Sequence, residues 1–183
     1  MQIDKTRCYD ELGRQLTALI EGERDLIANS ANMAALIFDG LTDLNWAGFY
    51  FTRQNELVLG PFQGKPACIR IGWGEGVCGA AAARGASIVV PDVHQFPGHI
   101  ACDPASRSEL VVPLLDNARV LGVLDLDSPV PGRFDDADRA GCERLVALFL
   151  ENQLRAKFDF IGTPVRFVQR LRKRDRGSSG GEE

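Results

Sequence analysis

The sequence predicts a single α+β domain in which helices pack on an antiparallel sheet. Three observations predict this fold class. Apolar residues recur at helical spacing near both ends of the chain, short alternating apolar runs occupy the middle, and polar turns join several of those runs. Strands linked by such turns pair antiparallel, so we expect a central sheet of about six strands. The 183 residues suffice for one domain of ordinary size.

The expected helices lie at the two ends of the chain and in one segment between strands. Residues 4–21 and 24–39 carry apolar side chains three to four positions apart, as an amphipathic helix requires. A small Ala-rich helix is expected to end at Gly85, where a glycine favours termination. Asp135 is expected to cap a long final helix that reaches about Phe160.

The expected strands follow the second helix and precede the last one. They comprise residues 45–51, 56–62, 67–72, 87–93, 109–115 and 119–127. In the first of them, Trp46 and Tyr50 share one face of the sheet, and Ala47 and Phe49 occupy the other. The fourth and fifth strands are separated by a loop over residues 94–108. Loops of this length are uncommon in compact domains unless they line a site.

Charge and hydropathy exclude several classes of protein. The net charge is −4, and the last eighteen residues carry six basic and three acidic side chains, so residues 1–165 carry −7. An acidic body does not favour nucleic-acid binding. No apolar run is long enough to span a membrane, and the N-terminus lacks the pattern of a secretory signal. We therefore expect a cytoplasmic domain over residues 1–160, followed by a basic, flexible tail over residues 161–183.

Five cysteines divide into two groups by their surroundings. Cys8 and Cys142 fall within helical patterns and are expected to be small packing residues. Cys68, Cys78 and Cys102 lie in segments punctuated by Gly and Pro, and Cys102 lies in the long loop. A polar, exposed loop is where a reactive thiol is expected, because burial in apolar surroundings raises a thiol's pKa and suppresses its reactivity.

Metal binding and peptide hydrolysis are weaker interpretations of the same residues. Cysteine and histidine are zinc ligands, but the chain has no CxxC or HxxxH pair of the kind that structural zinc sites usually show. A protease-like Cys–His pair rests only on His94 and His99 lying near Cys102 in sequence. We therefore expect no metal site and no cofactor.

Three carboxylates are expected on one wall of the sheet. Asp125 and Asp127 are two residues apart on a predicted strand, so their side chains share a face. Pairing with the preceding strand brings Glu109 near the same end. Carboxylates that share a wall repel one another, so at least one should keep a proton and act as an acid, while the ionised ones can hold an ammonium group. Alternatively, the two aspartates merely end the strand and face water.

Six sequence blocks occur along the chain in this order: NWAGFYF, LVLGPFQGKPAC, GVCGAAA, DVHQFPGHIACD, SRSELVVPLL and GVLDLDSPVPGRF. Together, over about residues 30–150, they are very similar to the free methionine-(R)-sulfoxide reductase family, a branch of the GAF-domain fold. The resemblance implies a GAF-like domain with its N- and C-terminal helices on one face of the sheet. It also implies an oxidoreductase that reduces free L-methionine (R)-S-oxide to L-methionine.

The resemblance further implies a role for each matched residue. Cys102 would be the nucleophile that is oxidised to a sulfenic acid, and Cys78 or Cys68 would then form a disulfide that thioredoxin reduces. Glu109 or Asp125 would supply the proton. The residues expected to bind the substrate are Trp46, Tyr50, Glu109, Asp125 and Asp127. A homodimer and a part in the oxidative stress response are also implied.

A GAF sensor module, which binds a small molecule without catalysis, is the alternative function. A helix at each end of the domain suits such modules. However, the chain lacks the N-K-x-F-D-E set associated with cyclic-nucleotide-binding members. Three cysteines near an acidic wall are also better explained by redox turnover than by a covalently bound chromophore.

Overall fold

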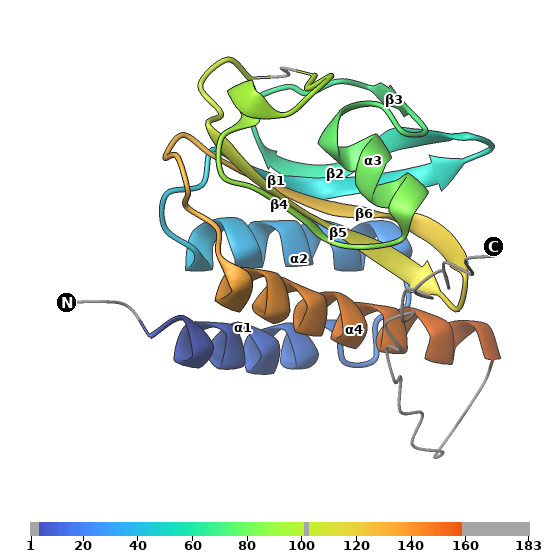
Figure 1. Ribbon diagram of the computed structural model, residues 1–183. Helices are drawn as coiled ribbons and strands as arrows, with labels where there is room; N and C mark the ends of the chain where they lie inside the picture. The colour runs from blue at the N-terminus through green and yellow to red at the C-terminus, as the bar shows by residue number, and fades with distance from the viewer. Residues whose placement is uncertain (1–3, 101–102, 159–183) are drawn as a thin grey trace, which may run out of the picture.

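The computed structural model describes residues 4–100 and 103–158, and its elements form the predicted α+β arrangement (Figure 1). The strands are β1 (Trp46–Arg53), β2 (Glu56–Gly64), β3 (Arg70–Gly72), β4 (Ile88–Val90), β5 (Ser108–Asp116) and β6 (Arg119–Ser128). The helices are α1 (Lys5–Ile20), α2 (Leu26–Gly40), α3 (Gly76–Arg84), the 3₁₀ turn η1 (Val93–Gln95) and α4 (Asp136–Phe158). The predicted tail over residues 161–183 lies outside the described residues.

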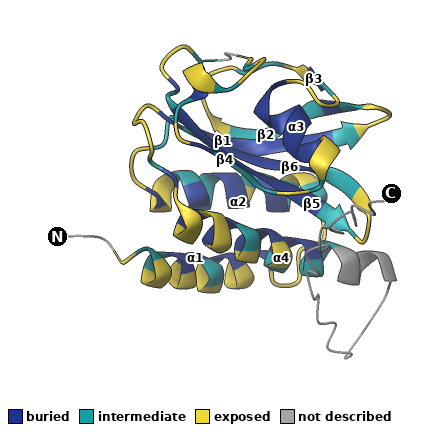
Figure 2. Ribbon diagram, viewed as in Figure 1, coloured by how far each residue is buried: buried dark blue, intermediate teal, exposed yellow. Residues whose placement is uncertain are grey.

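The strands form one sheet with the order β3-β2-β1-β6-β5-β4, and every neighbouring pair is antiparallel. Helices α2 and α4 cover one face of this sheet, and α1 packs against both of them (Figure 1). The opposite face carries α3 and the long loop. Figure 2 shows that α3 is mostly buried, whereas α1 exposes its outer side. No helix in the described ranges is long and apolar enough to cross a membrane.

Strand β1 distributes its side chains between two separate apolar clusters. Ala47 and Phe49 join the cluster beneath the sheet, where the three long helices pack. Trp46 and Tyr50 point the other way, into the cluster beneath α3. This alternation is the one predicted from the sequence, and it directs two aromatic rings towards the side of the sheet that carries the long loop.

The helix ends follow the predicted signals, but two strands are shorter than expected: β3 begins only at Arg70, and β4 covers only Ile88–Val90. The Asp135 carboxylate accepts hydrogen bonds from the first backbone N–H groups of α4, and Gly85 ends α3 in the left-handed conformation, with φ of 60°. Strand β4 stops at Val90, because Pro91 has no N–H with which to continue the ladder. The Asp92 carboxylate instead caps η1, which the sequence did not predict.

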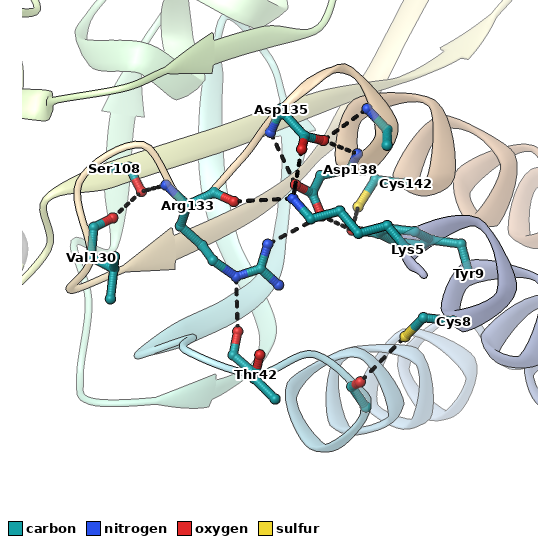
Figure 3. A network of polar contacts seen from close by, with 12 residues as sticks. Lys5, Cys8, Tyr9, Thr42, Ser108, Val130, Arg133, Asp135, Asp138 and Cys142 are labelled. Atoms are coloured by element: carbon teal, nitrogen blue, oxygen red, sulfur yellow. Dashed lines mark hydrogen bonds and ion pairs between the residues drawn. The ribbon is translucent and has the colours of Figure 1, made fainter. Parts of the chain in front are cut away.

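A buried polar network fixes α1 to the start of α4 (Figure 3). The fully buried Asp138 carboxylate accepts hydrogen bonds from Lys5 Nζ at 2.5 Å, Tyr9 Oη at 3.0 Å and Arg133 Nη1 at 3.1 Å. Cys142 Sγ lies 3.6 Å from the same Tyr9 hydroxyl. Because these partners come from both ends of the domain, the network closes the helical layer.

Substituting alanine at two glycines of the α1–α4 contact is expected to change the stability of the protein in opposite directions. A Cβ at Gly141 would lie 2.2 Å from the Tyr9 ring, whereas one at Gly13 would make an ordinary 3.5 Å contact with Leu148. We expect G141A to lower the free energy of unfolding by about 1–3 kcal/mol through overpacking. We expect G13A to raise it by about 0.5–1 kcal/mol, since alanine is the better helix former. Urea unfolding measures both, and equal effects would contradict the packing argument.

Candidate active site

A pocket enclosing a cavity of about 40 Å³ lies on the α3 side of the sheet. The long loop closes one side of it through His99, Ile100, Asp103 and Ser106. Six of the eight residues predicted for the site line this pocket: Trp46, Tyr50, Cys78, Glu109, Asp125 and Asp127. Cys68 packs, partly buried, against the neighbouring apolar cluster. Cys102 lies outside the described residues.

Strands β5 and β6 bring the three predicted carboxyl groups together. Glu109 is paired directly with Asp127, and Asp125 lies two residues before Asp127 on the same face of β6. Glu109 and Asp125 are each only 6% exposed. The alternative that the strand ends in water is therefore wrong for Asp125, which lies inside the pocket.

Helix α3 adds a thiol to this acidic wall. Cys78 Sγ lies 3.9 Å from Glu109 Oε1, and ligand atoms of Cys78, Glu109 and Asp125 all lie within 4.8 Å of one another. Helix α3 approaches this closely because the next residue is Gly79. A Cβ there would lie 2.3 Å from the Gly72 carbonyl oxygen at the end of β3.

Burial raises the pKa of four neighbouring acidic groups in the pocket, Cys78, Glu109, Asp125 and Asp127. For Asp125, loss of solvent raises the pKa to about 7. Burial, reinforced by the charge of Asp125, raises the pKa of Glu109 and of Asp127 well above the usual range. The pKa of the Cys78 thiol is raised for the same two reasons, with Glu109 adding to the effect. The pocket therefore offers carboxylic acid protons and an un-ionised Cys78 thiol near neutral pH.

Aromatic side chains from β1 lie beside the acidic residues, since Trp46 is paired directly with Asp127 of β6. The Trp46 ring stacks on Tyr50 with centroids 5.8 Å apart and on Phe62 with centroids 5.3 Å apart. Trp46 Nε1 donates a hydrogen bond to the Lys65 carbonyl oxygen at 3.2 Å, which fixes the indole in this position. Such side chains can pack an apolar group, and their ring faces attract a cation.

Polar contacts tie the long loop to the sheet at the pocket mouth. Asn45 Nδ2 donates hydrogen bonds to Asp103 Oδ2 at 3.2 Å and to Ser106 Oγ at 3.0 Å, and Lys65 Nζ lies 3.1 Å from Asp103 Oδ2. The Ala105 N–H and the Lys65 ammonium lower the pKa of Asp103. Asp103 therefore remains ionised and holds the loop immediately after Cys102 in sequence.

Sequence reasoning missed part of this site. Asn45, Lys65 and Ser106 received no role, although all three lie in or next to the sequence blocks that carry the family resemblance. His99 was considered only as a zinc ligand and as part of a protease-like pair with Cys102, not as a neighbour of the carboxyl groups. In the structure, His99 Nε2 lies 3.8 Å from Glu109 Oε2, and burial lowers the pKa of this imidazole. The positions of these residues within the sequence blocks were visible, but their roles could not be assigned without knowing their contacts in the folded protein.

The cysteines of the described residues differ in redox state. Cys68 takes part in a disulfide bond, whereas Cys8, Cys78 and Cys142 carry free thiols. Cys142 is fully buried in the helical core, and Cys8 packs partly buried against it. The prediction that these last two are packing residues is confirmed.

The chain is similar to known proteins over most of its length. A family model described as GAF domain matches residues 28–149. Free methionine-R-sulfoxide reductase of Escherichia coli is 53% identical over 79% of this chain and 88% of its own length. The protein of that name from Saccharomyces cerevisiae is 41% identical over 80% of this chain and 86% of its own. The free methionine-R-sulfoxide reductase of Neisseria meningitidis, solved in complex with its substrate, is 41% identical, with a TM-score of 0.81 over 86% of this chain and 95% of that one.

Proposed function

Because the chain belongs to the free methionine-R-sulfoxide reductase family of GAF-domain proteins, we propose that it reduces free methionine (R)-sulfoxide to methionine. One observation of the site carries this proposal: the pocket brings three carboxyl groups with raised pKa values and two aromatic side chains together beside the loop that carries a cysteine. This combination suits a small zwitterion whose sulfur is polarised and whose oxygen must be protonated.

The first chemical step is oxygen transfer from substrate to protein. The Cys102 thiolate attacks the electrophilic sulfur of the sulfoxide while a carboxyl group protonates its oxygen. The sulfur–oxygen bond of the substrate breaks, and the oxygen leaves as the hydroxyl of a sulfenic acid on Cys102. The substrate sulfur gains two electrons and becomes a thioether, and the Cys102 sulfur loses two.

The acidic wall has two tasks in this scheme. The Glu109 and Asp125 pair supplies the proton, since their mutual contact and burial keep one of them in the acid form. The remaining negative charge, with Asp127, holds the ammonium group of the amino acid. A methionine residue within a peptide lacks that ammonium group, which gives a physical reason for preferring the free amino acid. Trp46 and Tyr50 would pack the methyl and sulfinyl end.

Recycling requires a second cysteine, and we assign that role to Cys68. Its thiol attacks the sulfenic acid, a disulfide with Cys102 forms and water leaves. Two observations support Cys68 over Cys78: Cys68 takes part in a disulfide, while Cys78 carries a free thiol in a buried, acidic setting that keeps it un-ionised. A dithiol protein of the thioredoxin class would then reduce the disulfide and restore both thiols.

The setting of the reaction follows from this cycle. A reducing compartment such as the cytoplasm suits an enzyme whose disulfide must be reduced at every turnover. Removing oxidised methionine places the protein in the response to oxidative stress. The exposed apolar side chains of Leu19 in α1 and Ile27 in α2 would be covered in a homodimer formed through the terminal helices.

The test is methionine release from the sulfoxide. We expect the protein with dithiothreitol to convert the (R) diastereomer of free methionine sulfoxide and to leave the (S) diastereomer and an N-acetylated, amidated methionine sulfoxide unchanged. Chromatography of the products measures each rate. Binding of the sulfoxide without any methionine formation by the reduced protein would instead favour the sensor function and contradict the proposal.

A further inference from the structure

A set of metal-binding atoms converges in the pocket, independently of the cysteines that carry out the redox cycle. Cys78, Glu109 and Asp125 each present one ligand atom, and these atoms lie within 4.8 Å of one another. His99 Nε2 lies 3.8 Å from Glu109 Oε2 on the loop side. One sulfur and two carboxylate oxygens form a ligand set that suits zinc, and its two carboxyl groups were not among the cysteine and histidine ligands considered from the sequence.

One of these atoms lacks a partner inside the protein. Asp125 lines the cavity and is only 6% exposed. Its Oδ1 atom is buried and forms no hydrogen bond. A buried carboxylate oxygen without a partner is costly, so a group that binds in the cavity gains by satisfying it. A cation supplies that contact and also offsets the charge that Glu109 and Asp125 carry as its ligands.

The distances between the ligand atoms approach those around a tetrahedral zinc ion. Zinc bond lengths of about 2.0–2.3 Å place neighbouring ligand atoms about 3.3–3.8 Å apart. Cys78 Sγ and Glu109 Oε1 are 3.9 Å apart, so only small side-chain shifts are needed. The cavity of about 40 Å³ exceeds the roughly 10–15 Å³ that one water requires, so an ion fits.

We propose that this pocket binds one zinc ion through the Cys78 thiolate and the Glu109 and Asp125 carboxylates, and that the ion excludes the substrate. His99, whose Nε2 lies beside the other oxygen of Glu109, supplies the fourth ligand once its side chain moves towards the other three atoms. On binding, the Cys78 S–H bond breaks, a sulfur–zinc bond forms, and the proton leaves to solvent. The ion then occupies the carboxyl groups that would protonate the sulfoxide and hold its ammonium group. Inhibition rests on the proposed function, whereas binding does not.

Direct binding to the oxidised protein tests the site. With Cys68 held in its disulfide, we expect one equivalent of zinc to bind in competition with a chromophoric chelator, and cadmium to give a thiolate charge-transfer band. Magnesium, which prefers oxygen ligands, should not compete. C78S should weaken zinc binding at least about 100-fold, since even outer-shell changes cost roughly 10–100-fold. C8S is the matched control and should bind zinc like the unmodified protein.

A second pair of variants guards against misfolding of C78S. D125N should weaken zinc binding, and D116N, which alters an aspartate at the far end of the β5–β6 hairpin, should not. Thermal unfolding shows whether each variant is folded. Absence of stoichiometric binding, or binding unchanged in C78S and D125N, would overturn the proposed site.

Inhibition is measured separately in a single turnover of reduced protein without added thiol. We expect zinc to slow methionine formation at least about tenfold and excess chelator to restore it. Turnover at full rate with zinc bound would overturn the exclusion of substrate. Failure of the metal-free protein to form methionine would instead count against the proposed reductase function and leave the zinc site to be judged by the binding data.

Discussion

Replacing Cys102 with serine is expected to abolish methionine formation, with a loss on the order of 10³-fold or more. A serine hydroxyl is a poor nucleophile towards a sulfoxide sulfur, and it does not form the sulfenic acid that takes up the oxygen. The loss should appear both in steady state and in a single turnover, because the first chemical step is removed. Rapid-quench measurement of methionine in a single turnover, with no more than one equivalent of sulfoxide, distinguishes loss of the first chemical step from a defect in recycling.

Serine at Cys68 should give the opposite pattern. One equivalent of methionine should still form at close to the normal rate, after which turnover with thioredoxin should nearly stop, because the sulfenic acid has no partner thiol. Intact-protein mass spectrometry should then show an added oxygen where the unmodified protein shows a disulfide. A C8S variant, altered far from the pocket, should behave normally in both assays.

Cys78 provides the critical comparison, because it lies inside the pocket with a free thiol. If C78S, and not C102S, stopped the first turnover, the nucleophile would be Cys78 and the assignment of roles would be reversed. The structure argues against this outcome, because burial beside Asp125 and Glu109 raises the pKa of Cys78 and keeps it from ionising.

The sequence predicted those parts of the fold that depend on local periodicity. The alternation in β1 assigned Trp46 and Phe49 to opposite faces correctly, because side-chain direction in a strand follows from position alone. The end of β4 was placed too far along, since the missing N–H of Pro91 outweighed the apolar pattern around it. The outer position of α1 was not predictable, because an apolar stripe does not reveal which element it will pack against.

In the candidate site, too, the local features were predictable from the sequence and the contacts between distant segments were not. The shared wall of Glu109, Asp125 and Asp127 followed from strand spacing and a short turn, both of which are local. The approach of Cys78 to Glu109 did not, because it depends on how closely α3 packs beside β3, which the absence of a side chain at Gly79 permits. Contacts across long sequence separations, such as Lys65 with Asp103, leave no periodic signal.

Asp138 is expected to be the most costly single substitution in the helical layer. Its carboxylate is fully buried and accepts hydrogen bonds from Lys5, Tyr9 and Arg133, which join α1 to the start of α4 (Figure 3). Alanine there would leave two cations and a hydroxyl without their shared acceptor. Removing one partner of a buried ion pair costs about 3–5 kcal/mol, so D138A should unfold roughly 10 °C or more below the unmodified protein.

The matched control is an ion pair between the same two helices on the surface. Asp10 of α1 lies 3.2 Å from Arg144 of α4, with both side chains more than half exposed. Solvent screens such a pair, so D10A should change the free energy of unfolding by at most about 1 kcal/mol. Denaturant unfolding of both variants decides the matter. If D138A were no less stable than D10A, the buried network would contribute nothing to closing the helical layer, and apolar packing of α1 against α4 would have to account for it alone.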